Sequence, residues 1–478
     1  MPKTLLIFEV TGKQSYIFES KSLKENAMRS ACIGYVTSPA FFKDCDKAFS
    51  QEKNLVYSGG GHTVVQFDDA DTAFSFAKKV TERVCRMEYG PELMVKQLPY
   101  DDSRSPMENL MELSRQLEQK KAARKGVIRQ TSFGIEKSTV PPKTQIEGIE
   151  TLLPKPPFGY TFPTMFERLS GNDSYIAVIH IDGNGMGDRV SRIYENPEAN
   201  NWDSCVSLLN RFSQSIQTDY EAAFDTLCQE LTQYTDKKEL PIRPVILAGD
   251  DMCFITTGSI GLACANRLLT ILSKMKNPLD NRPYWACAGV AIVHRKFPFY
   301  RAYQLSEELC SNAKTYSSQL DSQKRVSAMD WHIEFGQIKG NLDTIREDYL
   351  TPDRDSLVLR PVVCAAPDET EFNALRSFSH FHKLCSAFAN KKFNLSRSKL
   401  KDFRTALKQG EEEAEFYVAD SRIKQLLSAG QAVNYTSDEA EMSTESDLEI
   451  FMQFPGEAHK RCLYFDAIEL MDRCDFLN

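Results

Sequence analysis

The chain has 478 residues, of which 42% are hydrophobic and 26% charged, and its formal net charge is −8. This length suits about three domains of usual size, and the acidic excess argues against a surface built mainly to hold duplex DNA. The 13 cysteines include no CxxC pair, so neither a zinc ribbon nor a disulfide framework is indicated. The opening residues lack the layout of a signal peptide, and no apolar run approaches a membrane span. We therefore expect a cytoplasmic protein with no membrane partner.

The first hundred residues predict a strand, a helix, a hairpin and a second helix. An apolar run over 4–10 predicts the strand, and 23–35 predict the first helix. The stretch "LVYSGGGHTVVQF" at 55–67 predicts two strands joined by a glycine turn. In the helix that follows, one stripe is apolar and comprises Ala73, Phe76, Ala77, Val80 and Val84.

The same order of elements recurs in the second half of the chain. At 175–187, "YIAVIHIDGNGMG" predicts a buried strand that runs into a glycine-rich loop. A long amphipathic helix follows, then "VILAGDDMCFITT" as strand, tight turn and strand, and then a helix over 260–275. The apolar stripe of the long helix comprises Leu209, Phe212, Ile216, Ala223 and Leu227. Two copies of one small domain are the simplest explanation.

The remaining segments predict a connection and a helical tail. Residues 101–168 contain a charged helix and the proline-rich "STVPPKTQIEGIETLLPKPPFGYTFP", whose prolines prevent regular pairing. After about residue 355 the pattern is mostly helical, and the acidic 437–449 predicts a loop. We predict four parts: 1–100 and 169–350 as the two copies, 101–168 as the connection, and 351–478 as a C-terminal helical domain.

The second copy places carboxylates at two neighbouring points of its predicted sheet. Asp182 directly follows the buried strand, and Asp250 and Asp251 form the turn of the hairpin. An antiparallel neighbour strand would bring that turn next to Asp182. Three carboxylates at one sheet edge would repel one another unless they shared a cation. Oxygen ligands with an incomplete protein shell suit Mg²⁺.

Each motif alone also has an ordinary structural explanation. A GDD turn by itself is usually just a turn, and "DGNGMG" by itself resembles a calcium loop or a capped turn. Together, each after a buried strand, they indicate the palm fold of nucleotide polymerases and cyclases. The fold class we predict is α+β, with two ferredoxin-like palm domains of the GGDEF and nucleotide-cyclase type plus a C-terminal helical domain.

Four segments of the second copy resemble one family closely: "YIAVIHIDGNGMGDRV", "VILAGDDMCFI", "WACAGVAIVHRKFPFYRAYQLSEELCSNAK" and "RVSAMDWHIEF". They are similar to the second palm of the large polymerase-cyclase subunit of type III CRISPR effector complexes. The opening "FEVTGKQSYIFES" and "YSGGGHTVVQF" resemble the first palm of that subunit, and the tail resembles its helical domain. The resemblance implies a prokaryotic antiviral protein that makes cyclic oligoadenylates from ATP at a GGDD turn.

The sequence departs from the family pattern in several places. Ala248 stands in the first glycine position of the turn, where we expect a methyl group to be tolerated. The N-terminal nuclease domain and the zinc cysteines between the palms are missing, and there is no His-Asp dipeptide, so we do not expect DNA cleavage. In the first palm Glu9 matches the metal aspartate, and the glycine turn replaces the acidic one. We therefore expect the first palm to be degenerate, holding a nucleotide without catalysing.

The resemblance and the chemistry of phosphoryl transfer together assign the site. We expect Asp182, Asp250 and Asp251 to be catalytic and to hold one or two Mg²⁺ ions, or Mn²⁺, with the carbonyl of Gly183 as an extra ligand. Lys314 aligns with a phosphate-contacting lysine of GGDEF cyclases, although a solvated helix lysine is an equal alternative. The other expected nucleotide-binding residues are Gly183, Asn184, Gly185, Gly249, Gly59, Gly60 and Gly61.

Several charged groups near the motifs have ordinary explanations. His180 lies inside the strand before Asp182 and is expected to be a packed core histidine. The basic segment 294–296 could meet phosphate or guide RNA, but solvated loop charges are favoured. Glu307 and Glu308 are expected to be helix-surface charges.

The predicted function is a nucleotidyltransferase that makes a cyclic or linear oligoadenylate from ATP and releases pyrophosphate. Its predicted partners are ATP, other CRISPR effector subunits and guide RNA. One alternative is a scaffold subunit without activity, in which the palms persist only as folds. Another is a GGDEF-like cyclase that uses GTP. The sequence leaves product length, base choice and oligomeric state open.

Overall fold

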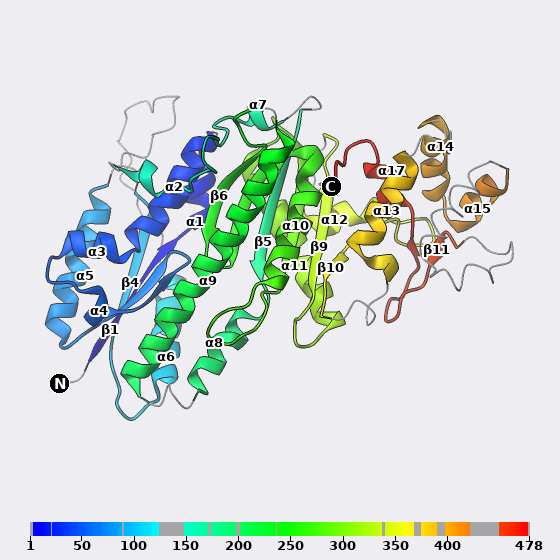
Figure 1. The fold of residues 1–478 in the computed structure, drawn as a ribbon. Coiled ribbons are helices and arrows are strands. Elements are labelled where there is room, and N and C mark those ends of the chain that lie inside the picture. Colours follow the sequence, from blue (N-terminus) through cyan, green and yellow to red (C-terminus); the bar gives the residue numbers. More distant parts are fainter. Residues whose placement is uncertain are drawn as a thin grey trace. The chain divides into compact units, whose positions relative to one another are not determined.

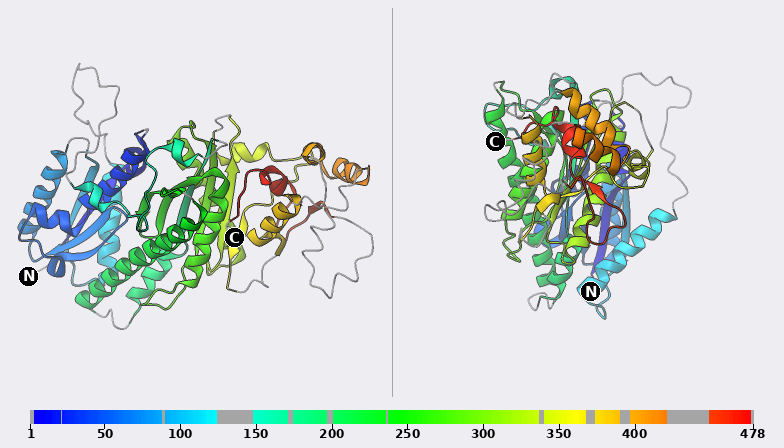
Figure 2. Two further views of the ribbon diagram at one scale, coloured as in Figure 1. Left: turned by 45° about the horizontal axis from the view of Figure 1, so that its top comes forward. Right: turned by 90° about the vertical axis from the view of Figure 1, so that its right-hand side faces the viewer.

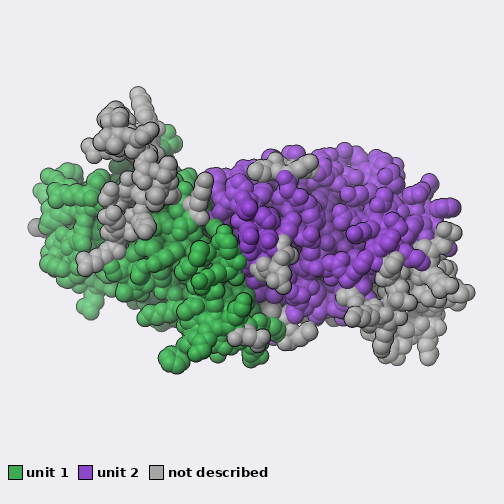
Figure 3. All heavy atoms as spheres, turned by 90° about the horizontal axis from the view of Figure 1, so that it is seen from above, with its two compact units in different colours: residues 1–168, 185–254, 276–282 green, residues 169–184, 255–275, 283–478 purple. Residues whose placement is uncertain are grey.

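The computed structural model in Figure 1 describes most of the chain. Two compact units are coloured in Figure 3: unit 1 comprises 1–168, 185–254 and 276–282, and unit 2 comprises 169–184, 255–275 and 283–478. Each is described by itself below, and the four-part division of the chain stays a prediction. The residues described are 3–20, 22–87, 90–123, 148–170, 174–196, 201–235, 237–336, 340–367, 374–389, 397–420 and 449–476.

The first palm is built on a four-stranded antiparallel sheet in unit 1. Its strand order is β2-β3-β1-β4, so the first strand of the chain lies in the interior of the sheet. The register pairs Glu9 with His62 on one side and with Met94 on the other. The strands are β1 (Thr4–Thr11), β2 (Leu55–Gly59), β3 (His62–Phe67) and β4 (Glu92–Pro99).

Alternation along β1 gives the first sheet two buried faces. Successive side chains of a strand point to opposite faces, and Leu5 and Leu6 are both fully buried. On one face Phe8 meets Phe42 of α3 (Pro39–Cys45) and Phe76 of α5 (Ala70–Cys85), with ring centroids 4.9 and 5.9 Å apart. The predicted apolar stripe of α5 is confirmed, with Ala77 half-buried and the other four residues buried.

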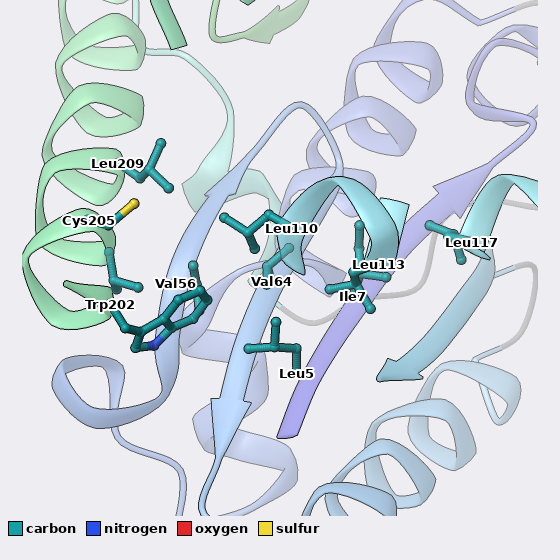
Figure 4. Packing of buried hydrophobic residues seen from close by; sticks show 11 residues of the cluster. Leu5, Ile7, Val56, Val64, Leu110, Leu113, Leu117, Trp202, Cys205 and Leu209 are labelled. Atoms are coloured by element: carbon teal, nitrogen blue, oxygen red, sulfur yellow. The ribbon is translucent and has the colours of Figure 1, made fainter. Parts of the chain in front are cut away.

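The opposite face is covered by α6 (Pro106–Ala122) and α9 (Trp202–Leu231). Figure 4 shows Leu5 and Ile7 of β1 beneath these helices, with Trp202, Cys205 and Leu209 on α9. The helix α6, cyan in Figure 2, contacts β1 and β4. The long helix predicted for the second copy therefore also packs on the first sheet, and all five residues of its predicted stripe are buried.

Shorter elements complete unit 1. Two of them, α1 and α8, begin directly after a glycine in the left-handed backbone region, at Gly12 and Gly185. Only glycine adopts that conformation without steric cost. The elements are α1 (Lys13–Phe18), α2 (Leu23–Val36), α4 (Gln51–Asn54), η1 (Ile149–Leu152), α7 (Phe166–Leu169), whose last residue lies in unit 2, α8 (Met186–Tyr194) and η3 (Thr232–Tyr234).

The second sheet has six strands in the order β10-β9-β8-β5-β7-β6. Its run β6-β7-β5-β8 repeats the order β2-β3-β1-β4 of the first sheet, which is the ferredoxin-like arrangement. The predicted fold class, with its repeat of one small domain, is confirmed. The strands are β5 (Tyr175–Gly183), β6 (Ile242–Ala248), β7 (Asp251–Thr257), β8 (Ala286–His294), β9 (Ser327–Ile333) and β10 (Val362–Ala365).

Helices α10 (Gly261–Lys274) and α11 (Phe299–Leu320) pack against β5 and β8 of this sheet. The contact with α11 is close at Gly289 of β8. A Cβ atom there would lie 2.0 Å from the Ser306 carbonyl oxygen and 2.3 Å from the Cys310 nitrogen. Glycine therefore sets the distance between β8 and α11, the helix that carries Lys314.

The C-terminal part is mainly helical, as predicted, but it also adds strand β10 to the sheet. Arg360, fully buried, ties α17 to this region through ion pairs with Asp466 (2.7 Å) and Glu469 (3.1 Å). The acidic loop predicted at 437–449 falls almost entirely outside the described residues. The remaining elements of unit 2 are η4 (Gly258–Ile260), α12 (Leu342–Glu347), η6 (Ala374–Arg376), α13 (Phe378–Ala389), α14 (Arg397–Leu407), α15 (Glu411–Asp420), β11 (Phe451–Met452), β12 (Arg461–Cys462) and α17 (Phe465–Leu470).

No helix in the described ranges combines the length and apolar character needed to cross a lipid bilayer.

Candidate functional site

Asp182 lies at the C-terminal end of β5, where the sequence predicts a strand end. Its side chain is 39% exposed. The backbone continues through Gly183 and Asn184 to the left-handed Gly185, and there α8 begins. The strand therefore holds the Asp182 carboxylate at its end with part of its surface open to solvent.

Lys314 of α11 contacts this strand end directly. Its ammonium group lies 2.5 Å from the Asp182 carboxylate and donates a hydrogen bond to the Gly183 carbonyl oxygen at 2.9 Å. These are two oxygen atoms that we predicted as Mg²⁺ ligands. Lys314 is thus an ion-paired lysine, not the purely solvated alternative considered from the sequence.

The side chain of Asn184 serves the structure of the loop. Its amide donates to the carbonyl oxygen of Val326 at 2.8 Å, and its backbone N–H donates to the carbonyl oxygen of Trp285 at 2.7 Å. Both bonds fix the loop against β8 and β9. Contact of Asn184 with a nucleotide remains a prediction, and its described hydrogen bonds supply no argument for one.

The GDD turn belongs to unit 1 and joins β6 to β7. Gly249 has a φ of 70°, in the left-handed region, so a residue with a Cβ would be strained there. Gln217 of α9 braces the turn, because its side-chain oxygen accepts a hydrogen bond from the Gly249 N–H at 2.6 Å. Gln217 could not be identified from the sequence, because it belongs to no motif and simply follows the apolar Ile216.

The donor chemistry at these positions fits a hard divalent cation. Carboxylate and carbonyl oxygens are the ligands that Mg²⁺ prefers, and an ammonium group already bridges two of them at Asp182 and Gly183. Within the part of the chain that the structure describes, no ready-made group of three His, Cys, Asp or Glu side chains was found that could hold a metal. Asp182 belongs to unit 2 and the GDD turn to unit 1, so the shared metal stays a prediction.

The first palm repeats the arrangement with different residues. Glu9 stands three residues before the left-handed Gly12, just as Asp182 stands three residues before Gly185. Lys121 of α6 lies 2.8 Å from the Glu9 carboxylate, as Lys314 of α11 pairs with Asp182. Helices α6 and α11 each follow the fourth strand of their palm. Each palm thus pairs a carboxylate at the end of its first strand with a lysine from the equivalent helix.

The glycine turn of the first palm adjoins this pair. Gly60 and Gly61 both have positive φ, 58° and 77°. A Cβ at Gly61 would lie 2.7 Å from Ile33, whereas one at Gly60 would meet only the His62 ring, at 3.7 Å. Gly59 lies against α9, since its Cβ would be 3.2 Å from the Ser213 hydroxyl. Gly60 is therefore the position of this turn at which a side chain would be least obstructed.

Three expectations about nearby charges can now be compared with the structure. His180 is buried and packs edge-on against Tyr303, and burial lowers its pKa although Glu307 and Asp182 oppose this. It is a core histidine, as predicted. Segment 294–296 follows the end of β8 that pairs with Tyr175, away from Asp182. Glu307 and Glu308 are half-buried on α11, where Glu307 accepts a hydrogen bond from Tyr303 (2.9 Å) and Glu308 accepts one from Leu342 N–H (2.6 Å).

A comparison with protein families matches residues 175–322 to the family described as Cas10/Cmr2, second palm domain. The predicted resemblance is confirmed. The match begins with the first residue of β5 and includes Asp182, the GDD turn and Lys314 in one domain. A comparison with curated proteins finds no match.

Three solved structures of similar fold show the likeness. The Csm1–Csm4 cassette in complex with cA4 matches with a TM-score of 0.58 and 13% identity, over 99% of this chain and 70% of that chain. The apo cassette matches with a TM-score of 0.54 and 14% identity, over 99% and 70%. The cassette with AMPPNP matches with a TM-score of 0.47 and 14% identity, over 66% and 53%. At such identities the likeness concerns the fold, and this chain spans only 53% to 70% of those chains.

Proposed function

We propose that the chain is a nucleotidyltransferase that joins ATP molecules into a cyclic or linear oligoadenylate and releases pyrophosphate, as part of prokaryotic antiviral defence. One observation carries the proposal. The second palm retains Asp182, Asp250 and Asp251 at the ends of adjacent palm strands, within the segment that matches the Cas10/Cmr2 palm family. The first palm has lost the equivalent acidic turn, although it keeps the same fold.

The proposed chemistry assigns a role to each group of the second palm. Asp182, Asp250, Asp251 and the Gly183 carbonyl would hold Mg²⁺ or Mn²⁺, which when bound supplies positive charge to the reacting phosphate. Lys314 would leave the Asp182 carboxylate and contact the phosphates of the ATP that is attacked. Gln217, through Gly249, would hold the turn in place for the reaction. The 3′-hydroxyl oxygen of a second ATP would form a bond to the α-phosphorus and release its proton to solvent, while the bond from the α-phosphorus to the β-phosphate oxygen breaks and pyrophosphate leaves in line.

The solved structures of similar fold support the proposed class of partner. They are structures of a Csm1–Csm4 cassette, and one of them holds cA4. We propose by this likeness that the chain also assembles with other CRISPR effector subunits and, through them, with guide RNA. A cytoplasmic location belongs to the same proposal.

The proposal is tested by incubating the protein with each nucleoside triphosphate in Mg²⁺ and in Mn²⁺, and measuring released pyrophosphate. Release from ATP is expected. Release from GTP alone would instead favour a GGDEF-like cyclase. Release from no nucleotide with either metal would favour a scaffold subunit and contradict the proposal.

The first palm is proposed to hold the attacking ATP at its glycine turn, because joining two nucleotides requires two sites. We expect Gly60→Asn to fold, because Asn tolerates positive φ, and to place a side chain where little obstructs it. The variant should bind one ATP in Mg²⁺ and join nucleotides about 100-fold more slowly. Equilibrium dialysis with a pyrophosphate assay measures both.

The control is Gly60→Val, in which the β-branched side chain is strained at a φ of 58°. We expect this variant to lose thermal stability as well as activity. The first palm would be removed from the substrate site if the folded Asn variant turned over normally or still bound two ATP molecules.

A further inference from the structure

The metal position of the first palm is already occupied by an ammonium group. Lys121 lies 2.8 Å from the Glu9 carboxylate and 2.6 Å from the Glu118 carboxylate. Although burial lowers the pKa of Lys121, its hydrogen bonds with Glu118 and Glu9 raise it overall. A cation entering this site would have to displace a lysine that two carboxylates hold in its charged form. Lys121 therefore neutralises the Glu9 carboxylate, as a metal ion would. Because two carboxylates balance its positive charge, Lys121 does not attract a further anion.

A second lysine of the same palm is engaged differently. Lys13 is the first residue of α1, immediately after the left-handed Gly12, and its ammonium group donates to the carbonyl oxygen of Gly60. Among the described residues, no carboxylate lies within ion-pair distance of Lys13. An ammonium group has three N–H donors, and a neutral carbonyl accepts one of them. Two donors of the Lys13 ammonium group thus remain for an anion.

Two negative charges of unit 1 act on Lys13. Burial lowers the pKa of Lys13 overall, and the negative charges of Glu9 and Asp251 only partly oppose this. Both residues belong to unit 1. The equivalent residue of the second palm, directly after Gly185, is the uncharged Met186.

We infer that the first palm binds the phosphates of its nucleotide without a metal ion, using the Lys13 ammonium group at the Gly60 turn. Two N–H donors of Lys13 and the backbone of the glycine turn contact the phosphate oxygens, and the Glu9–Lys121 pair excludes a cation from the strand end. This inference rests on the proposed function and deepens it. One ATP binds at a metal-dependent site in the second palm, and the other binds at a metal-independent site in the first palm. The recognised group is the triphosphate.

The inference is tested by measuring nucleotide binding to the full chain in excess EDTA, by isothermal titration calorimetry. ATP is expected to bind at one site per chain. Tripolyphosphate should compete with it, and adenosine should not, because the phosphates are recognised. Lys13→Met and Lys13→Gln should each weaken this binding about 10-fold or more, as expected for loss of a charged hydrogen-bond donor, while Lys13→Arg should retain most of it.

Two further variants serve as controls. Lys47→Met makes the same charge change at an exposed lysine of the first palm, 78% exposed, and should bind like the unaltered protein. Lys314→Met alters the second palm and should also leave metal-free binding intact. Thermal unfolding of every variant distinguishes loss of the binding site from loss of the fold. Two neutral substitutions at Lys13 are used so that the test still works if one of the variants does not fold.

Three outcomes would overturn the inference: no ATP binding in EDTA, binding that is unchanged in the folded Lys13→Met and Lys13→Gln variants, or binding that depends on Lys314 and not on Lys13. The proposed function has its own readout, which is pyrophosphate release in Mg²⁺. If the protein releases pyrophosphate but binds no ATP in EDTA, the proposed function is supported and the metal-free site in the first palm is contradicted. If the protein binds ATP in EDTA at Lys13 but releases no pyrophosphate in Mg²⁺, the metal-free site is supported and the proposed function is contradicted.

Discussion

Replacing both Asp250 and Asp251 with Asn is expected to reduce the rate of product formation from ATP by at least about 100-fold. Each change removes a negative charge from the proposed metal ligands and changes side-chain volume very little. The Gly249 N–H bond to Gln217 uses a backbone group, so the turn should keep its shape. Product formation is measured by pyrophosphate release in saturating Mg²⁺.

The matched control removes the same two charges from exposed carboxylates outside the palm motifs, by Glu412→Gln and Glu413→Gln on α15. This control should keep full activity, and both double variants should unfold within a few degrees of the unaltered protein. Unchanged turnover in the folded Asn double variant would remove Asp250 and Asp251 from the mechanism.

The largest effect on stability is expected for Gly289→Ala. The added methyl group would lie 2.0 and 2.3 Å from backbone atoms of α11, and backbone cannot rotate away as a side chain can. We expect the free energy of unfolding to fall by about 3 kcal/mol or more. Because α11 carries Lys314, any folded fraction should also have a displaced Lys314 and lower activity. Denaturant unfolding followed by circular dichroism measures the loss.

Gly187→Ala provides the control, since nothing lies within 4 Å of a Cβ built there. Gly187 is exposed in the first turn of α8, so we expect its replacement to change the free energy of unfolding by no more than about 0.5 kcal/mol. Equal stability of the Gly289→Ala and Gly187→Ala variants would show that β8 and α11 do not pack as closely as described.

Much of the fold could be predicted because the two palms repeat one pattern. Buried strands with glycine at their turns and helices with a stripe of apolar residues are visible in the sequence, and β1, β5 and α9 lie where they were expected. Strand β10 was missed because four residues supply too little periodicity for a prediction. The dual role of α9, which covers the first sheet although it follows β5 in sequence, depends on long-range packing that no local pattern reveals.

The candidate site was predictable only where a motif carried it. Asp182 and the GDD turn follow buried strands, so their positions could be inferred from the sequence. The ion pair of Glu9 with Lys121 joins residues 112 positions apart (121 − 9), and the brace from Gln217 to Gly249 joins residues 32 apart. Such partners are determined by tertiary packing. Lys13 had one visible signal, its place directly after the glycine that ends the first strand.

The most direct test of the central claim is mass spectrometry of the products formed from ATP by the purified protein in Mg²⁺, with the Asp250→Asn, Asp251→Asn double variant alongside. We predict that the unaltered protein forms oligoadenylates, cyclic or with a 5′-triphosphate, in step with released pyrophosphate, and that the double variant forms neither. Recovery of unreacted ATP from both proteins, or of the same oligoadenylates from both, would contradict the proposed function of the second palm.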